Sequence, residues 1–285
     1  METINRVRDT FSLIRFSHTI FALPFALASM LVAARGLPPL PVVFIILVCM
    51  VFARTSAMAI NRYIDADIDA ANPRTANRHL PQGILSRRYV LGLGVGSGLA
   101  FVIATYFLNP LAFTLSPVAL AIVWGYSYTK RFTHYTQLFL GLALAISPIG
   151  AWIAVTGAFA TPPLLLGGAV LFWVAGFDIF YSTGDYEFDR SHGIKSLVVR
   201  FGIGGSLKLA RAFHILTVLL LLAFGAYVPT PGPYLFACLL VSSLLGYEHS
   251  LVKADDLSRV NQAFFTLNGW IGMIYLCGTA VAVIL

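Results

Sequence analysis

The sequence predicts an all-α protein that crosses a membrane several times, and three observations support this fold class. Hydrophobic residues account for 58% of the 285 residues and charged residues for only 11%, whereas a soluble domain carries roughly a quarter charged residues. The mean hydropathy is +0.82. The apolar residues fall in stretches of about 20, the length that a helix needs to cross a hydrocarbon core roughly 30 Å thick.

Nine such stretches follow one another along the chain, and we expect each to form a transmembrane helix. They cover approximately residues 16–34, 41–60, 89–108, 111–128, 136–156, 163–183, 206–228, 233–252 and 262–285. No small-residue cleavage site follows the first stretch, so we expect it to stay attached rather than to be removed as a signal peptide. Residues 1–285 are expected to form a single transmembrane domain.

The basic residues predict the orientation of these helices. In the nine-helix arrangement only Arg35 lies on the face that holds the loops after helices 1, 3, 5 and 7, and the other eighteen Lys and Arg residues lie on or near the opposite face. By the positive-inside rule that richer face is cytoplasmic. Topology therefore explains the net charge of +7, which gives no reason to expect a nucleic acid as partner. All twelve Asp and Glu residues also map to or near this face, so we expect the polar chemistry there.

The first acidic segment lies at the predicted cytoplasmic end of the second stretch. Asn61, Asp65 and Asp69 recur every four residues, and residues with this spacing lie along one face of a helix. Mg²⁺ prefers oxygen ligands, typically carboxylates combined with substrate phosphates. These three side chains are therefore candidate metal ligands.

A second acidic segment repeats this spacing at the end of the sixth stretch. Asp185 and Asp189 are four residues apart, and Asp178 lies two turns earlier. Carboxylates gathered beneath a bilayer repel one another unless a cation neutralises them. The alternative is that these acids are solvated helix ends or partners of nearby Arg residues, which is usual for isolated charges. Two segments with the same spacing favour a divalent metal.

Basic residues stand close to both acidic segments. Arg74 and Arg78 follow the first segment, and Lys195 follows the second. A third inner loop adds Tyr126 and Lys130. Arg binds phosphate through two parallel hydrogen bonds and Lys acts as a compact charge, so the basic residues here are suited to contact phosphate groups. For Tyr126 and Lys130, the alternative is an aromatic and basic anchor at the membrane interface.

In this order and at these separations, the segments resemble the UbiA-type superfamily of membrane-embedded prenyltransferases. The family pattern Asn-x-x-x-Asp-x-x-x-Asp matches residues 61–69, and its Arg-Thr-x-x-Arg and Leu-Pro-x-Gly patterns match residues 74–78 and 80–83. Its second Asp-x-x-x-Asp matches residues 185–189, and its Tyr-x-x-x-Lys matches residues 126–130. The resemblance covers essentially the whole chain and implies nine helices around a central apolar cavity, in a bundle like that of the prenyl synthases.

The resemblance also implies a reaction, in which a polyprenyl group passes from its diphosphate to an aromatic acid, 4-hydroxybenzoate or a dihydroxynaphthoate, in quinone biosynthesis. Two Mg²⁺ ions, one at each acidic segment, would bind the diphosphate, and the resemblance implies that Arg74, Arg78, Tyr126, Lys130 and Lys195 would bind it as well. Asp65, Asp69, Asp185 and Asp189 would then be catalytic, with Asn61 as a further metal ligand. An apolar chamber would exclude water from the allylic cation and admit the prenyl tail from the membrane lipid. The implied location is a bacterial-type inner membrane, with the active site facing the cytoplasm.

Two departures from the family pattern bear on the acceptor. Many relatives carry Asp directly after the motif Asn, where this chain has Arg62, and many quinone-pathway relatives have Asp-Lys-Pro where this chain reads Ser17-His18-Thr19. The stretch from His18 to Ala26 is similar to a bacterial subgroup linked to menaquinone made through futalosine. Arg15 and His18 are candidates to bind the acceptor, although Arg15 is equally a topology charge.

Aromatic residues are expected to line the chamber and to stabilise positive charge through their π faces, with ordinary packing as the alternative for each. The candidates are Phe16, Phe21, Tyr63, Phe177 and Tyr181. Glu248 and His249, near the predicted inner face, receive no role and are expected to solvate the surface. Packing roles are expected for the three isolated Cys residues and for the Gly-x-x-x-Gly pairs among residues 92–98.

Two other functions remain open at this point. A secondary transporter would bind a coupling ion through acids in its spans, whereas the acidic segments of this chain cluster at one interface. A relative that prenylates a non-quinone acceptor would share the metal chemistry and differ only in the second substrate.

Overall fold

The structure is a computed structural model that describes residues 2–13 and 21–285, with side chains from residue 8 onward. The two acceptor candidates, Arg15 and His18, and the aromatic candidate Phe16 lie outside the described residues. The described residues form helices and no strand beyond an isolated bridge between Lys253 and Asp256. The all-α fold class is therefore confirmed.

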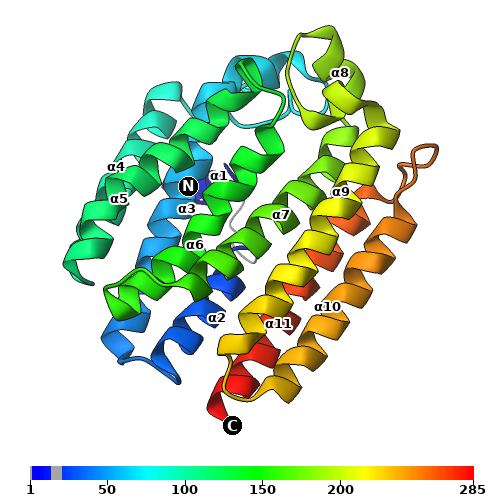
Figure 1. The fold of residues 1–285 in the computed structure, drawn as a ribbon. Helices are drawn as coiled ribbons and strands as arrows, with labels where there is room; N and C mark the ends of the chain where they lie inside the picture. The colour runs from blue at the N-terminus through cyan, green and yellow to red at the C-terminus, as the bar shows by residue number, and fades with distance from the viewer. Residues whose placement is uncertain (1, 14–20) are drawn as a thin grey trace. The chain divides into compact units, whose positions relative to one another are not determined.

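The helices follow one another along the chain (Figure 1). They are α1 (Glu2–Leu13), α2 (Leu23–Ala34), α3 (Leu40–Ala71), α4 (Arg87–Tyr106), α5 (Pro110–Gly125), η2 (Tyr126–Arg131), α6 (Thr136–Thr156), α7 (Thr161–Thr183), α8 (Tyr186–Ser191), α9 (Leu197–Phe224), η3 (Gly225–Tyr227), α10 (Pro231–Leu251), η4 (Gln262–Leu267) and α11 (Asn268–Ile284). Most are α-helices; η2 and η3 are 3₁₀ helices and η4 is a π-helix.

Among the described residues, eight helices are long and apolar enough to cross a membrane, so the expected count of nine is wrong for this part of the chain. The stretch predicted at 16–34 is represented by α2, which has only 12 residues and spans about 18 Å at 1.5 Å per residue. Pro24 stands in its first turn, where proline is favoured. Its end is closed by Arg35 in a left-handed conformation, with the Gly36 N–H bonded to the Leu31 carbonyl.

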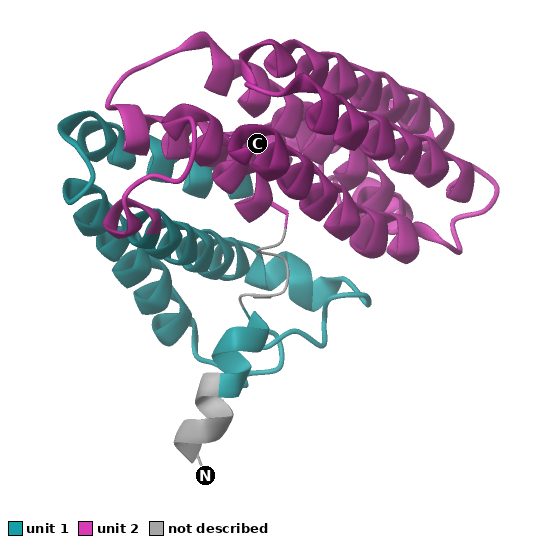
Figure 2. Ribbon diagram, turned by 90° about the horizontal axis from the view of Figure 1, so that it is seen from below, with its two compact units in different colours: residues 1–19, 44–128 teal, residues 20–43, 129–285 magenta. Residues whose placement is uncertain are grey.

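The chain divides into two compact units (Figure 2). Unit 1 comprises residues 1–19 and 44–128, and unit 2 comprises residues 20–43 and 129–285. Unit 1 thus contains the first acidic segment, and unit 2 contains the second.

In unit 1, α4 packs closely on α3 because its glycines leave room. A Cβ atom on Gly94 would lie 2.8 Å from the Ile60 side chain, and one on Gly98 would lie 2.8 Å from Trp124. Ser56 donates a 2.7 Å hydrogen bond to the Gly94 carbonyl and accepts one of 2.9 Å from the Trp124 indole. The packing role expected for this Gly-x-x-x-Gly pair is confirmed.

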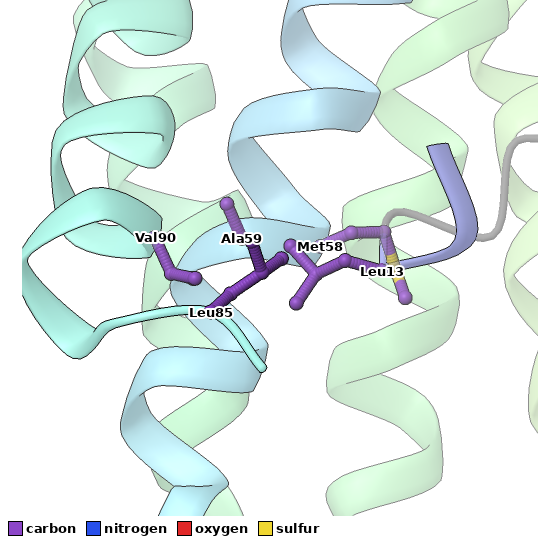
Figure 3. Close-up of a cluster of buried hydrophobic side chains, with 5 residues drawn as sticks. All are labelled: Leu13, Met58, Ala59, Leu85 and Val90. Atoms are coloured by element: carbon purple, nitrogen blue, oxygen red, sulfur yellow. The ribbon is translucent and has the colours of Figure 1, made fainter. Parts of the chain in front are cut away.

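A small apolar cluster in unit 1 joins α1 to the region beyond the first acidic segment (Figure 3). Its buried members are Leu13, Met58, Ala59, Leu85 and Val90. The aromatic candidate Tyr63 packs against this cluster. The cluster therefore ties the start of α4 to α3.

In unit 2, α7 packs against both α6 and α9, while α2 packs against α6 and α11. The approach of α6 to α7 depends on Gly141, because a Cβ there would lie 2.2 Å from the Leu171 carbonyl oxygen. Ser29 of α2 donates a 2.6 Å hydrogen bond to the Pro148 carbonyl of α6. These close contacts fix the helix that leads into the second acidic segment.

Candidate functional site

The first acidic segment is part of α3, which continues through it without a break to Ala71. Asp65 and Asp69 are 3% and 5% exposed, so the four-residue spacing places both carboxylates on the buried face. Asp67, between them, is exposed and pairs with Arg87 on the surface. The helical period therefore separates two candidate ligands from a solvent-facing carboxylate.

Asn61 is joined to Asp65 by a hydrogen bond from Nδ2 to Oδ2 of 2.9 Å. The same nitrogen also donates to the Ser127 hydroxyl at 3.3 Å. Because the side-chain nitrogen Nδ2 is used in these hydrogen bonds, the side-chain oxygen Oδ1 of Asn61 is the atom left to ligate a cation. Tyr126, a predicted diphosphate ligand, precedes Ser127 in η2, so unit 1 brings this residue next to the first acidic segment.

Asp69 faces two guanidinium groups. Its Oδ1 accepts a 2.6 Å hydrogen bond from Arg78 Nη1, and its Oδ2 lies 3.8 Å from Arg62 Nη1. Thr75 Oγ1 donates to the Asp69 carbonyl at 3.0 Å, and the Asn72 carbonyl accepts from the Thr75 N–H at 2.9 Å. These bonds fold the Arg-Thr-x-x-Arg stretch back onto the end of α3, which brings Arg78 to the first acidic segment.

The oxygen atoms of this segment suit a hard cation such as Mg²⁺. Asp69 Oδ2 is buried and, among the described residues, has no hydrogen-bond partner. The Asp65 carboxylate and the Asn61 amide lie on the same helix face. No three His, Cys, Asp or Glu side chains converge as a metal site in the described part of the chain. Mg²⁺ usually takes one or two protein carboxylates and completes its shell with water and substrate phosphates.

The second acidic segment lies between α7 and α9 in unit 2. Asp185 precedes α8, and its carbonyl accepts the Asp189 N–H at 2.8 Å, so the two acids stand one helical turn apart. Both side chains are half-buried. Asp178 is half-buried within α7. The expected pairing of Asp185 with Asp189 on one turn is thus present.

Two predicted diphosphate ligands meet next to this segment. The Lys195 N–H donates to the Lys130 carbonyl at 2.9 Å, and Lys195 Nζ donates to the Phe132 carbonyl at 3.3 Å. Gly193, with φ of 69°, allows the turn that carries Lys195 there. Unit 2 therefore joins the end of η2 to the loop after α8, and brings the backbones of both lysines together.

Three of the predicted aromatic residues form one cluster in unit 2. The Phe21 and Phe177 ring centroids are 5.5 Å apart, and Phe264 stands 5.9 Å from Phe21 and 5.3 Å from Phe177. Tyr181 stacks on Phe264 at 4.5 Å. Phe264 belongs to the π-helix η4, which no sequence pattern indicated. Whether this cluster faces the prenyl chain stays a prediction.

The expectation that Glu248 solvates the surface is wrong, because its side chain is fully buried in unit 2. Its Oε1 accepts a 2.9 Å hydrogen bond from Asn268, whose Oδ1 accepts one of 2.7 Å from the Trp173 indole. His249 is half-buried and contacts His214 at 3.0 Å. A carboxylate and an amide inside apolar stretches were the sequence signals for this network.

Relatives and solved structures place these features in a known class. The 4-hydroxybenzoate octaprenyltransferase of Vibrio atlanticus (strain LGP32) is 29% identical over 260 residues, which cover 91% of each chain. The apo structure of a UbiA homologue from Aeropyrum pernix K1 matches with a TM-score of 0.84 and 33% identity, over 93% of this chain and 97% of that one. A UbiA homologue from Archaeoglobus fulgidus bound to DMAPP and Mg²⁺ shares the fold, with a TM-score of 0.76 and 20% identity, over 96% of this chain and 99% of that one.

The helical membrane fold and its polar segments thus define a membrane prenyltransferase. The model of the UbiA prenyltransferase family matches residues 22–270, and this chain belongs to that family. It is therefore a multi-pass membrane enzyme that transfers prenyl groups. Family membership favours the transferase over the transporter that the sequence left open.

Proposed function

We propose that this enzyme transfers a polyprenyl group from a polyprenyl diphosphate to the ring of an aromatic acid in quinone biosynthesis. The observation that carries the proposal is the buried face of α3, where Asn61, Asp65 and Asp69 are aligned and Arg78 reaches the last of them. Polar oxygens and a guanidinium in this arrangement suit a metal-bound diphosphate. The names of the Vibrio relative and the DMAPP-bound neighbour support the same substrates.

Two Mg²⁺ ions would bind at the two acidic segments. Asn61, Asp65 and Asp69 would bind one, and Asp185 and Asp189 would bind the other. When bound, Mg²⁺ neutralises the diphosphate oxygens and so makes the diphosphate a better leaving group. Mg²⁺ in the DMAPP-bound neighbour supports the choice of metal.

The basic side chains then compensate the remaining charge of the diphosphate. Arg74, Arg78, Lys130 and Lys195 would supply positive charge, and Tyr126 would donate a hydrogen bond from its hydroxyl. Their donors stabilise the charge that grows on the diphosphate as the allylic C–O bond breaks. The ring carbon ortho to the phenolic hydroxyl forms the new C–C bond, and the proton on that carbon is lost as aromaticity returns.

The acceptor is proposed to be 4-hydroxybenzoate or a dihydroxynaphthoate. The Vibrio relative is named for 4-hydroxybenzoate, whereas the stretch from His18 to Ala26 resembles the menaquinone subgroup. Arg15 and His18 are the proposed acceptor-binding residues. We further propose that residues 1–285 work as one domain in a bacterial-type inner membrane, with the active site on the cytoplasmic side, as the distribution of Lys and Arg indicates.

A transfer assay with two acceptors tests the proposal. Purified protein is incubated with Mg²⁺, a radiolabelled allylic diphosphate and either 4-hydroxybenzoate or 1,4-dihydroxy-6-naphthoate, and the prenylated product is separated from the diphosphate. We expect transfer to one of the two acids, and none when EDTA removes the metal. Metal-dependent transfer to neither acid would reject the proposed acceptor class.

A further inference from the structure

Arg62 is a basic residue within the first acidic segment. It directly follows Asn61 in α3. Its side chain is only 9% exposed, and its Nη1 lies 3.8 Å from Asp69 Oδ2. A guanidinium stays charged at any physiological pH, and a buried charge is screened little by salt. The segment therefore contains a permanent positive charge beside a proposed metal ligand.

Arg62 differs from Arg78, the other guanidinium at Asp69. Arg78 donates a 2.6 Å hydrogen bond to Oδ1, and its side chain is 19% exposed. Arg62 lies 3.8 Å from Oδ2, which has no hydrogen-bond partner among the described residues. Arg62 thus acts on Oδ2 through its charge and leaves that oxygen's lone pairs available. Oδ2 is the atom that a metal ion would contact.

In the absence of substrate, the Arg62 guanidinium opposes the binding of a divalent cation at Asp69. A divalent cation at Asp69 Oδ2 would sit close to the Arg62 guanidinium, and the two positive charges would repel each other in a poorly screened environment. The repulsion falls when a diphosphate, with its several negative charges, binds at the same place. Arg62 is then attracted to the ligand and no longer opposes the metal.

We propose that Arg62 makes metal binding depend on diphosphate: it weakens Mg²⁺ binding to the substrate-free enzyme and couples the metal and the diphosphate so that they bind together. The inference rests on the proposed function. Coupling of this kind is reciprocal, because a diphosphate that strengthens metal binding is itself bound more tightly when metal is present. Arg62 is a positioning residue in this account, since it sets the charge at Asp69 rather than touching the reacting carbon.

The test measures metal binding without turnover. Mn²⁺ serves as the probe, and its free concentration is followed by electron paramagnetic resonance in titrations of the full chain in detergent, with and without inorganic pyrophosphate. Protein-free titrations correct for the Mn²⁺ that pyrophosphate binds in solution. For Arg62→Gln we expect Mn²⁺ affinity without pyrophosphate to rise on the order of tenfold. The increase in Mn²⁺ affinity that pyrophosphate causes should be smaller by the same factor.

Charge-graded variants separate this role from packing. Arg62→Lys keeps the charge, so it should keep the wild-type dependence on pyrophosphate, whereas Arg62→Asp should bind Mn²⁺ still more tightly than Arg62→Gln. Arg88→Gln removes an exposed positive charge from the same unit and should behave as wild type. A thermal melt of each variant checks folding. If Arg62→Gln fails to fold, the comparison of Arg62→Lys and Arg62→Asp decides the question in its place.

Two outcomes would overturn the inference, in distinguishable ways. Unchanged or weaker Mn²⁺ binding to Arg62→Gln and Arg62→Asp, with an undiminished gain from pyrophosphate, would reject the role of Arg62 and leave the proposed function standing. Wild-type protein that binds no Mn²⁺ even with pyrophosphate would reject the metal site itself, and this inference with it.

Discussion

Arg78 Nη1 lies 2.6 Å from Asp69 Oδ1, so a residue predicted to bind diphosphate is paired with a residue predicted to bind metal. The Asp69 side chain is 6% exposed and that of Arg78 is 19% exposed. The pair therefore joins the loop after α3 to the first acidic segment, where both residues are proposed to act.

Replacing one member of this pair should destabilise the protein more than replacing both. Arg78→Gln leaves the buried Asp69 carboxylate with less compensation, at a cost of about 3 kcal/mol for a broken buried pair. In the double variant Arg78→Gln/Asp69→Asn no charge of the pair remains, so part of the stability returns. Thermal unfolding in detergent is measured for Arg78→Gln, for Asp69→Asn and for the double variant. Additive losses in the double variant would show that the pair is not coupled.

Gly141 should tolerate no larger residue. In Gly141→Ala the new Cβ would lie 2.2 Å from the Leu171 carbonyl oxygen, which belongs to backbone and cannot move aside. Overpacking of this kind costs about 1–3 kcal/mol. Gly150→Ala is the matched control, because Gly150 is in the same helix and nothing lies within 4 Å of its Cβ position. Equal melting temperatures for the two variants would contradict the close packing of α6 on α7.

Glu248 should accept Gln better than Ala. Glu248→Gln keeps an oxygen that accepts the 2.9 Å hydrogen bond from Asn268. Glu248→Ala leaves the buried Asn268 amide with one acceptor fewer and opens a cavity, for a combined loss of about 2–4 kcal/mol. Thermal melts of both variants, with the yield of folded protein, provide the measurement. A Gln variant as unstable as the Ala variant would show that the hydrogen bond contributes nothing.

His79 should make the protein less stable in mild acid. Burial lowers the pKa of this imidazole from 6.5, the Arg62 charge lowers it further, and Asp9 opposes both. As the pH falls below 6.5, the unfolded chain takes up a proton that the folded chain does not, so stability decreases until the pH reaches the lowered pKa. Between pH 7.5 and pH 5.5, His79→Gln should lose less thermal stability than wild type. An identical loss in both proteins would exclude His79 as a contributor.

The features that sequence could predict are local ones. The four-residue spacing placed Asp65 and Asp69 on one face of α3, and the structure confirms that both are buried while Asp67 is exposed. Apolar stretches predicted the all-α membrane fold for the same reason, since the length of a helix and its hydrophobicity are properties of a continuous segment.

The features that sequence missed depend on contacts between distant segments. The apolar stretch predicted at 16–34 ends at Ala34 as expected, but its helix α2 begins only at Leu23, so the difference in length lies at its start. Glu248 is buried because Asn268 and Trp173 form a hydrogen-bonded network in unit 2, which α10 alone does not reveal. The two guanidiniums at Asp69 belong to Arg62, within α3, and to Arg78, in the loop after it. The turn after Asn72 returns the chain toward α3, so that Arg78 reaches Asp69.

Isosteric variants two residues apart test most directly whether the buried carboxylates of α3 bind the metal and the diphosphate. Asp65 is 3% exposed on the proposed ligand face, whereas Asp67 is exposed and paired with Arg87. In the Mg²⁺-dependent prenyl transfer assay, we predict that Asp65→Asn lowers the rate at least about 100-fold, as for loss of a charge that acts on the transition state. Asp67→Asn should stay within about twofold of wild type, since an exposed ion pair contributes little. Equal activity of the two variants would contradict the assignment.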